Sequence, residues 1–228
     1  MQFEEKTPIE IVEMLKKQGI LTSEGNVLIN LMGVSAKMKE NSAIGYVFQE
    51  WFACWLKENN IFFRENTNSQ EFPDFYLDAD SNENKLLEVK TFDFNAGANF
   101  DVANFDAYCR SLKTKAYRLD ADYLIFGYTF KDGVLEIKDI WLKKIWEITC
   151  PSKKFPIKTQ NKQDVIYNIR PAVWFSTKAT YPVFGTEKNF MKGLFETLKK
   201  YKSEEFAREW INEVEANNLR YKGKSLNL

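Results

Sequence analysis

A hairpin signal near the middle of the chain most constrains how it can fold. The runs DYLIFGYTF (122–130) and VLEIKDIWL (134–142) are rich in β-branched and aromatic residues, and Asp132-Gly133 lies between them. Asp-Gly readily adopts the left-handed backbone that a two-residue hairpin turn needs. The pattern therefore predicts two long antiparallel strands at the centre of the fold.

Further extended segments surround this hairpin in the sequence. PDFYL (73–77) and KLLEVKTF (85–92) are separated by the turn-forming stretch DADSNEN, which predicts a second antiparallel pair. One more strand is expected over 163–176, where Pro171 interrupts it. The chain therefore has enough strands for one central sheet.

Helices are expected on both sides of these strands in the sequence. Residues that can cap a helix precede four of them: Thr7 in a capping box with Glu10, Ser42, Thr186 and Ser203. The helix after Ser42, IGYVFQEWFACWLKEN, carries apolar residues around most of its circumference, which is typical of a buried helix. Another helix should begin near Val102. Together these elements predict one α/β domain with a central mixed β-sheet flanked by helices.

Composition excludes several kinds of chemistry. The 228 residues include no histidine, which rules out Ser-His-Asp and Cys-His catalysis and histidine-ligated zinc. Cys54, Cys109 and Cys150 are too far apart for a zinc motif and are expected to be buried thiols in a reducing compartment. The first residues do not resemble a signal peptide, and no run approaches the roughly 20 apolar residues of a membrane span. A cytoplasmic protein with no membrane partner is expected.

The zero net charge conceals an asymmetry between the two parts of the chain. Residues 1–90 contain 9 basic and 15 acidic residues, a net charge of −6, and residues 91–228 contain 23 and 17, a net charge of +6. A basic segment is typical of a surface that faces a polyanion, although scattered lysines on a solvated surface give the same sum.

Three charged residues on the predicted strands form a candidate catalytic site. Alternate side chains of a strand share a face, so Glu88 and Lys90 point the same way, and Asp74 can join them from the neighbouring strand. Two carboxylates suit Mg²⁺, which neutralises charge and acidifies water in phosphodiester hydrolysis. Lys90 can orient or deprotonate the attacking water. Such a site needs no histidine.

Pro73-Asp74 followed by Glu88-Val89-Lys90 resembles the signature of the PD-(D/E)-x-K nuclease superfamily, which includes most type II restriction endonucleases. The resemblance implies a restriction-endonuclease-like fold in which Asp74 and Glu88 bind the metal and Glu50 adds a further acidic group from the preceding helix. It also implies one nuclease domain over 1–228, with an N-terminal helical part (1–41), a catalytic core (42–130) and a part for DNA contact that ends in helices (131–228).

Within this superfamily, a chain without helicase, ATP-binding or methyltransferase segments is similar to an orthodox type II restriction enzyme. The expected activity is Mg²⁺-dependent hydrolysis of double-stranded DNA at a specific short sequence by a homodimer, leaving 5′-phosphate ends. A DNA repair, junction-resolving or transposon nuclease would show the same three residues. A DNA-binding module without catalysis is the alternative from another class.

Amide and basic side chains after Lys90 are the candidate DNA contacts. Amides and guanidinium groups suit base edges, and lysines suit phosphates. The candidates are Asn95, Asn99, Asn104, Arg110, Lys113, Lys115, Arg118, Arg170 and Lys178. Arg110, Lys113, Lys115 and Arg118 are expected on one side of a helix, and SKKFPIKTQNK (152–162) is expected to be a mobile basic loop.

Each site residue also has an interpretation without function. Asp74 could cap a turn, and Glu88 with Lys90 could be a solvent-facing pair that contributes a few tenths of a kcal/mol. Glu50 could be a polar position on a partly exposed helix, with Gln49 equally available to the site. The basic cluster could be a solvated helix face.

Overall fold

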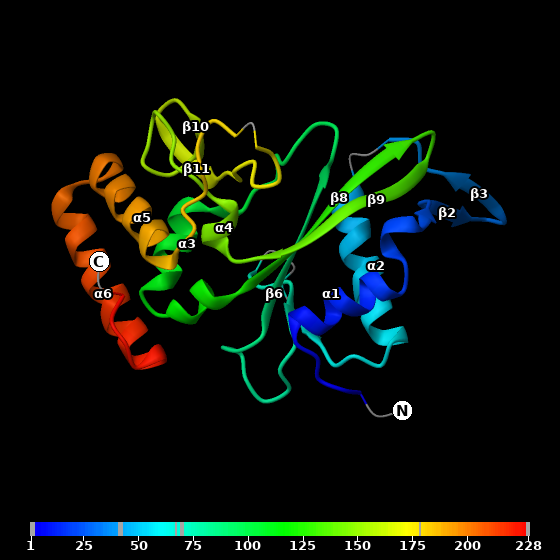
Figure 1. Cartoon of the computed structure of the whole chain (residues 1–228), viewed down its shortest axis with the longest axis horizontal. Coiled ribbons are helices and arrows are strands. Elements are labelled where there is room, and N and C mark those ends of the chain that lie inside the picture. Colours follow the sequence, from blue (N-terminus) through cyan, green and yellow to red (C-terminus); the bar gives the residue numbers. More distant parts are fainter. Residues whose placement is uncertain (1–2, 41–42, 67, 69–70, 178, 227–228) are drawn as a thin grey trace. The chain divides into compact units, whose positions relative to one another are not determined.

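The computed structural model describes residues 3–40, 43–66, 68, 71–177 and 179–226 (Figure 1). The chain forms two compact units, each built from two segments. Unit 1 comprises residues 1–98 and 122–143, and unit 2 comprises residues 99–121 and 144–228. The functional division into 1–41, 42–130 and 131–228 stays a prediction.

Unit 1 is organised around a six-stranded mixed sheet in the order β1-β9-β8-β6-β5-β4. Its strands are β1 (Glu24–Gly25), β4 (Arg64–Glu65), β5 (Phe75–Tyr76), β6 (Leu86–Asp93), β8 (Asp122–Lys131) and β9 (Val134–Lys143). The neighbours β6 and β8 are parallel, and the other neighbouring pairs are antiparallel. The mixed sheet expected from the sequence is confirmed.

Both strand pairs predicted from turn signals are present. Asp132 and Gly133 have positive φ angles of 52° and 74°, and they join β8 to β9. Phe75 of β5 lies opposite Leu87 of β6 in an antiparallel pair. The β5–β6 pairing is shorter than the two predicted runs, but it fixes the register that places Asp74 beside Glu88.

Helices α1 (Pro8–Lys17) and α2 (Ile44–Glu58) pack their apolar residues against this sheet. The predicted capping box of α1 is present, since Thr7 accepts a hydrogen bond from the backbone of Glu10 and the Glu10 carboxylate accepts one from the backbone of Thr7. A short 3₁₀ helix, η1 (Ile20–Thr22), follows α1. Ser42, the predicted cap of α2, lies outside the described residues.

The expectation that α2 is buried around most of its circumference is wrong. Phe48, Phe52 and Leu56 are buried, whereas Glu50 and Cys54 are exposed. Tyr46 and Trp51 of the same helix are also exposed, so its large apolar residues do not all mark its buried side. The exposed Cys54 corrects the expectation that all three cysteines are buried, while Cys109 and Cys150 are buried as expected.

A second, two-stranded sheet in unit 1 was not predicted from the sequence. Strands β2 (Leu28–Leu31) and β3 (Val34–Lys37) form an antiparallel hairpin within the segment that was expected to be helical. In Figure 1 this hairpin, in dark blue, projects from the end of unit 1 near α2. Its residues are exposed on both faces.

Unit 2 combines a three-stranded antiparallel sheet, in the order β10-β11-β7, with helices. The strands are β7 (Ala103–Asn104), β10 (Thr159–Lys162) and β11 (Val165–Ile169). The helices are α3 (Phe105–Leu112), η2 (Ala116–Asp120), α4 (Ile145–Ile148), α5 (Glu187–Tyr201) and α6 (Glu204–Lys222). Thr186 and Ser203 cap α5 and α6, as predicted.

The basic segment 152–162 is not a mobile loop as a whole. Phe155 and Ile157 are buried, and the segment ends in β10, which pairs with β11. Its apolar residues anchor it in the core of unit 2. The strand expected over 163–176 is limited to β11, because Gln163 and Asp164 have positive φ angles and form the turn before it.

None of the helices in the described part of the chain is both long enough and apolar enough to cross a membrane.

Candidate active site

The β5–β6 pairing brings Asp74 next to Glu88. Asp74 directly precedes β5, and Glu88 lies on β6, where it is 7% exposed. The buried Val89 alternates with Glu88 and Lys90 along the strand, so its side chain points to the opposite face of the sheet. The sheet therefore holds all three predicted residues at one position in unit 1.

Two hydrogen bonds lock the carboxylates of Asp74 and Glu88 in place. The backbone N–H of Asp74 donates to Oε2 of Glu88 over 3.2 Å, and the backbone N–H of Val89 donates to Oδ2 of Asp74 over 2.7 Å. Each residue thus uses the backbone of the other strand. The Asp74 carboxylate therefore binds the backbone of the neighbouring strand, whereas a turn cap would bind the backbone of its own turn.

Lys90 completes the arrangement through an ion pair. Its Nζ lies 2.7 Å from Oε1 of Glu88, and the two side chains are 22% and 9% exposed. A partly buried pair of this kind is screened less than a surface pair. The interpretation of Glu88 and Lys90 as a solvent-facing pair is therefore wrong.

Gln49 of α2 is the group that the helix brings to the site. Its Nε2 donates a hydrogen bond of 3.0 Å to Oδ1 of Asp74. The sequence predicts Glu50 at this place, with Gln49 equally available. Helical spacing could have identified Gln49, since it lies three, four and seven residues before the buried Phe52, Ala53 and Leu56.

Glu50 lies on the exposed face of α2, one residue further along. Its charge acts on Glu65 of β4, whose pKa is raised by burial and then by Glu50. Among the residues that the structure describes, no group of three or more acidic or cysteine side chains could hold a metal ion. The structure therefore unites Asp74 and Glu88 but does not group Glu50 with them.

The two neighbouring carboxylates of Asp74 and Glu88 favour the binding of a cation. Burial, and then the neighbouring Glu88 carboxylate, raise the pKa of Asp74 to about 7, while Lys90 and the hydrogen bonds from Val89 and Gln49 act in the opposite direction. Two carboxylates close together resist ionising both at once unless positive charge is added. Oxygen ligands of this kind suit a hard divalent cation.

The candidate DNA contacts lie in both units. In unit 1, Asn95 is exposed in the turn after β6. In unit 2, Arg170 pairs with Asp101 and also donates to the backbone carbonyl of Asn99. Its guanidinium therefore holds the segment before β7 in place.

The basic cluster is not carried by one helix face. Arg110 is exposed on α3, which ends before Lys113, and Arg118 lies in η2. Lys113 pairs with Glu213 of α6 over 2.9 Å, whereas Lys115 is exposed between the two helices. The expectation of a single basic helix face is wrong because the helix is only eight residues long.

Asn104 has a structural task in unit 2. Its side-chain oxygen accepts a hydrogen bond of 3.0 Å from the backbone of Ala107, which caps α3. Lys178, another candidate, lies outside the described residues. None of the contacts described here tests whether these side chains bind DNA, so their role stays a prediction.

Comparisons with known proteins agree with this fold. The model of the NgoBV restriction endonuclease family matches residues 5–228. The chain is 39% identical to the type II restriction enzyme NlaIV of Neisseria lactamica over 188 residues, which cover 82% of this chain and 77% of that protein. It is 35% identical to the type II restriction enzyme NgoBV of Neisseria gonorrhoeae over 153 residues, which cover 66% of this chain and 86% of that protein.

The solved structure of the NlaIV restriction endonuclease has the same fold. It matches with a TM-score of 0.93 and 35% sequence identity, over 98% of this chain and 93% of that one. The restriction-endonuclease-like α/β fold predicted from the sequence is confirmed. The chain belongs to the NgoBV restriction endonuclease family and is a type II restriction endonuclease-like protein.

Proposed function

We propose that this chain is a Mg²⁺-dependent type II restriction endonuclease of the PD-(D/E)-x-K kind, which cleaves double-stranded DNA at a specific short sequence and leaves 5′-phosphate ends. The observation that carries the proposal is the joining of Asp74, Glu88 and Lys90 by short contacts at one place on the sheet. Membership of a family of restriction endonucleases favours this activity over repair, junction-resolving or transposon nucleases and over a DNA-binding module.

Asp74 and Glu88 are the residues that would hold the metal. An ionised carboxylate offers about four lone-pair sites, so the hydrogen bonds described above leave room for a cation on both groups. With only two protein carboxylates, water and phosphate oxygens would complete the coordination of Mg²⁺. The metal would supply charge neutralisation at the scissile phosphate and a more acidic water.

Lys90 acts on the other reactant. The ion pair with Glu88 fixes its ammonium beside the two carboxylates. From there, Nζ can donate to the attacking water and orient its lone pair toward phosphorus, or stabilise the negative charge that develops on the phosphate. Water loses a proton to the solvent and forms a new P–O bond, the bond from phosphorus to the 3′ oxygen breaks, and that oxygen takes up a proton from the solvent, which gives a 5′-phosphate and a 3′-hydroxyl.

Gln49 keeps Asp74 ready for this task. The neutral amide donates to one carboxylate oxygen while the Val89 backbone donates to the other. The two donors together fix the plane of the carboxylate, and precise placement of a metal ligand depends on such support. Glu50 remains a candidate for a direct role, but we propose Gln49 as the positioning residue of α2.

DNA contact is assigned to basic and amide residues that are exposed or half-buried. Arg110, Lys115 and Arg118 would neutralise phosphates, and Asn95, Asn99 and Arg170 are candidates for base edges. Two copies of the chain would act on the two strands of the duplex, because each copy carries one set of Asp74, Glu88 and Lys90. A homodimer is therefore part of the proposal.

Sequencing the ends of cleaved DNA tests the proposal. The purified protein is incubated with unmethylated plasmid DNA and MgCl₂, and the ends are ligated to adaptors and sequenced. We expect cuts at one short recurring sequence with ligatable 5′-phosphates. Cuts scattered without a common sequence, or no cuts in any DNA, would contradict site-specific cleavage.

A further inference from the structure

The β2–β3 hairpin exposes an unusual amount of apolar surface. All of its residues from 28 to 37 are exposed. Five large apolar side chains in it are between 53% and 94% exposed: Leu28, Ile29, Leu31, Met32 and Val34. Apolar patches of more than a few hundred Å² are rare on monomers and usually mark interaction sites.

The composition of this hairpin fits a protein partner better than DNA. Lys37, at the end of β3, is the one charged residue between 28 and 37, whereas affinity for phosphates comes mostly from several lysines and arginines. The centres of protein–protein interfaces are depleted of charged residues and enriched in large apolar ones. A hairpin of two strands is also only marginally stable without support on at least one face.

Met32, at the turn of the hairpin, is an unusual residue for its backbone conformation. Met32 and Gly33 have φ angles of 52° and 77°, nearly the same as Asp132 (52°) and Gly133 (74°) in the β8–β9 hairpin. Aspartate tolerates this left-handed backbone better than methionine does. Met32 is nonetheless 94% exposed, so contacts within the chain do not explain a methionine at the tip.

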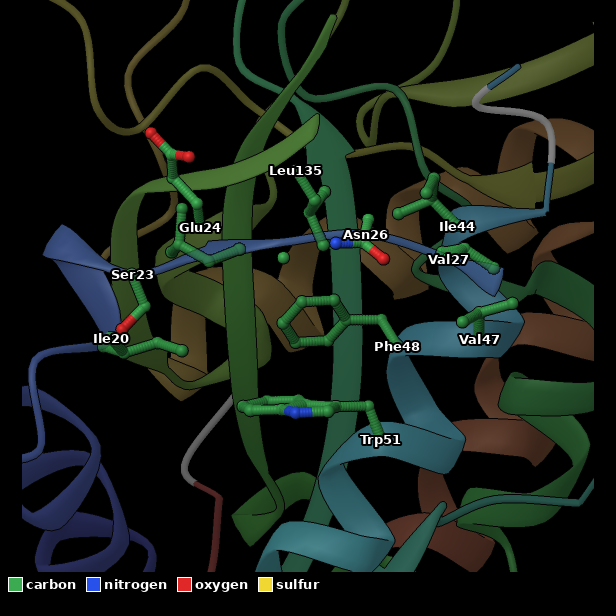
Figure 2. Close-up of a pocket in the computed structure, with 12 residues that line it drawn as sticks. Ile20, Ser23, Glu24, Asn26, Val27, Ile44, Val47, Phe48, Trp51 and Leu135 are labelled. Atoms are coloured by element: carbon green, nitrogen blue, oxygen red, sulfur yellow. The ribbon is translucent and has the colours of Figure 1, made fainter. Parts of the chain in front are cut away.

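An apolar pocket lies at the base of the same hairpin. It has a volume of about 200 Å³, and its lining includes the segment Glu24–Val27, which directly precedes β2. Figure 2 shows Phe48 and Trp51 extending from α2 into this pocket, with Val27 and Leu135 beside them. A flexible, unbranched methionine side chain is well suited to fill such a space.

We infer that the β2–β3 hairpin is a dimerisation arm, and that Met32 of one copy binds in the pocket at the base of the hairpin of a second copy. When two hairpins lie side by side around a two-fold axis, the tip of each meets the base of the other. Each copy thus carries both halves of the contact, the exposed apolar tip and the apolar pocket, and a stable interface of this kind typically buries about 800 Å² per partner. The inference rests on the proposed function, which requires a second copy for the second DNA strand.

Sedimentation velocity over a concentration series, without DNA, tests this inference with matched variants. Ile29→Asp places a charge in the hairpin, and Ile9→Asp places one on α1, where isoleucine has a similar exposure (60% and 63%). Met32→Asp changes the tip to the residue found at the same φ in the other turn, so the monomer should fold at least as well. We expect a wild-type dimer, a dissociation constant raised roughly tenfold or more by both hairpin substitutions, and none of this effect for Ile9→Asp.

Several results would overturn the inference. These are a wild-type chain that stays monomeric with and without DNA, a dimer that survives Ile29→Asp and Met32→Asp, and equal dissociation of Ile9→Asp. Loss of DNA binding by Met32→Asp with the dimer intact would assign the hairpin to DNA instead. The proposed function fails separately: a dimer that the hairpin variants dissociate, but that cuts no DNA, would sustain the arm and contradict the nuclease.

Discussion

The side-chain amide of Gln49 donates a hydrogen bond of 3.0 Å to Oδ1 of Asp74, and so connects α2 to the start of β5. A neutral donor at this place favours the ionised form of Asp74, whereas a carboxylate would disfavour it. The neighbouring Glu50 points to the exposed face of the helix and cannot replace this contact without a change in helix orientation. Substitutions of these two adjacent residues should therefore have different effects on cleavage.

Replacement of Gln49 should impair cleavage more than replacement of Glu50. Gln49→Leu removes the hydrogen bond that orients Asp74 and should lower kcat roughly tenfold or more, because small displacements of a metal ligand are costly. Glu50→Gln should leave kcat within about twofold, as expected for an exposed side chain. Plasmid cleavage with saturating MgCl₂ measures both.

A charged variant of the same size tests how the side chain at position 49 affects the ionisation of Asp74. Gln49→Glu keeps the size of the side chain but adds negative charge next to Asp74, which should move the acidic limb of the pH–rate profile to higher pH. If Glu50→Gln abolishes cleavage and Gln49→Leu does not, Glu50 is the residue that α2 contributes.

Stability without metal should fall with rising pH because of Asp74. Its pKa is about 7 in the folded protein, raised by burial and then by Glu88, and ordinary in the unfolded chain. The folded state therefore binds the proton more tightly, so this contribution is present below about pH 4 and is lost as the pH rises through 7. The loss is at most roughly 1.4 kcal/mol per pH unit.

Urea unfolding of the wild type and of Asp74→Asn, from pH 4 to pH 8 in EDTA, isolates this effect. The free energy of unfolding of the wild type should decline relative to that of the variant, and MgCl₂ at pH 8 should restore it in the wild type only. Parallel pH dependence of the two proteins would show that Asp74 does not titrate in this range.

The basic residues of unit 2 should differ in their effect on DNA binding. Arg110 and Lys115 are exposed, whereas Lys113 is engaged with Glu213. Arg110→Ala and Lys115→Ala should each lower the slope of log K against log salt by roughly one, and Lys113→Ala by less. Binding is measured in CaCl₂, and Lys17→Ala on α1 is the control. Unchanged slopes for both exposed residues would remove this cluster from the interface.

Asn104 can be tested for capping and base recognition separately. Asn104→Asp keeps the oxygen that caps α3 and should preserve stability, whereas Asn104→Ala should cost about 1 kcal/mol. If Asn104 only caps the helix, cleavage by Asn104→Asp stays specific. A relaxed recognition sequence in Asn104→Asp, read from sequenced ends, would show that its amide also reads a base.

The strands and the grouping of Asp74, Glu88 and Lys90 could be predicted from the sequence, because the sequence patterns that indicate them are local. Asp132-Gly133 marks a turn by itself, and the alternation in LLEVKTF places Glu88 and Lys90 on one face. Asp74 follows from the pairing of two neighbouring strands. These features depend on residues close in sequence, so backbone geometry alone is sufficient to predict them.

The remaining features depend on contacts between distant segments. The choice between Gln49 and Glu50 is decided by the rotation of α2 against the sheet, and large exposed aromatic residues on that helix obscured its apolar face. The β2–β3 hairpin has apolar residues on both faces and therefore lacks the alternation that identifies a strand with one buried face. The basic cluster spans α3, its end and η2, which a continuous helical pattern did not reveal.

The central claim is that Asp74, Glu88 and Lys90 form a metal-dependent catalytic site. The most direct measurement is cleavage of duplex DNA in MgCl₂ by the wild type, Asp74→Ala, Glu88→Ala and Lys90→Ala, with binding in CaCl₂ measured in parallel. The proposed site predicts cleavage by the wild type and a loss of roughly 10²–10³-fold or more in each variant, with DNA binding largely retained. Undiminished cleavage by Lys90→Ala, or wild-type cleavage that persists in EDTA, would contradict it.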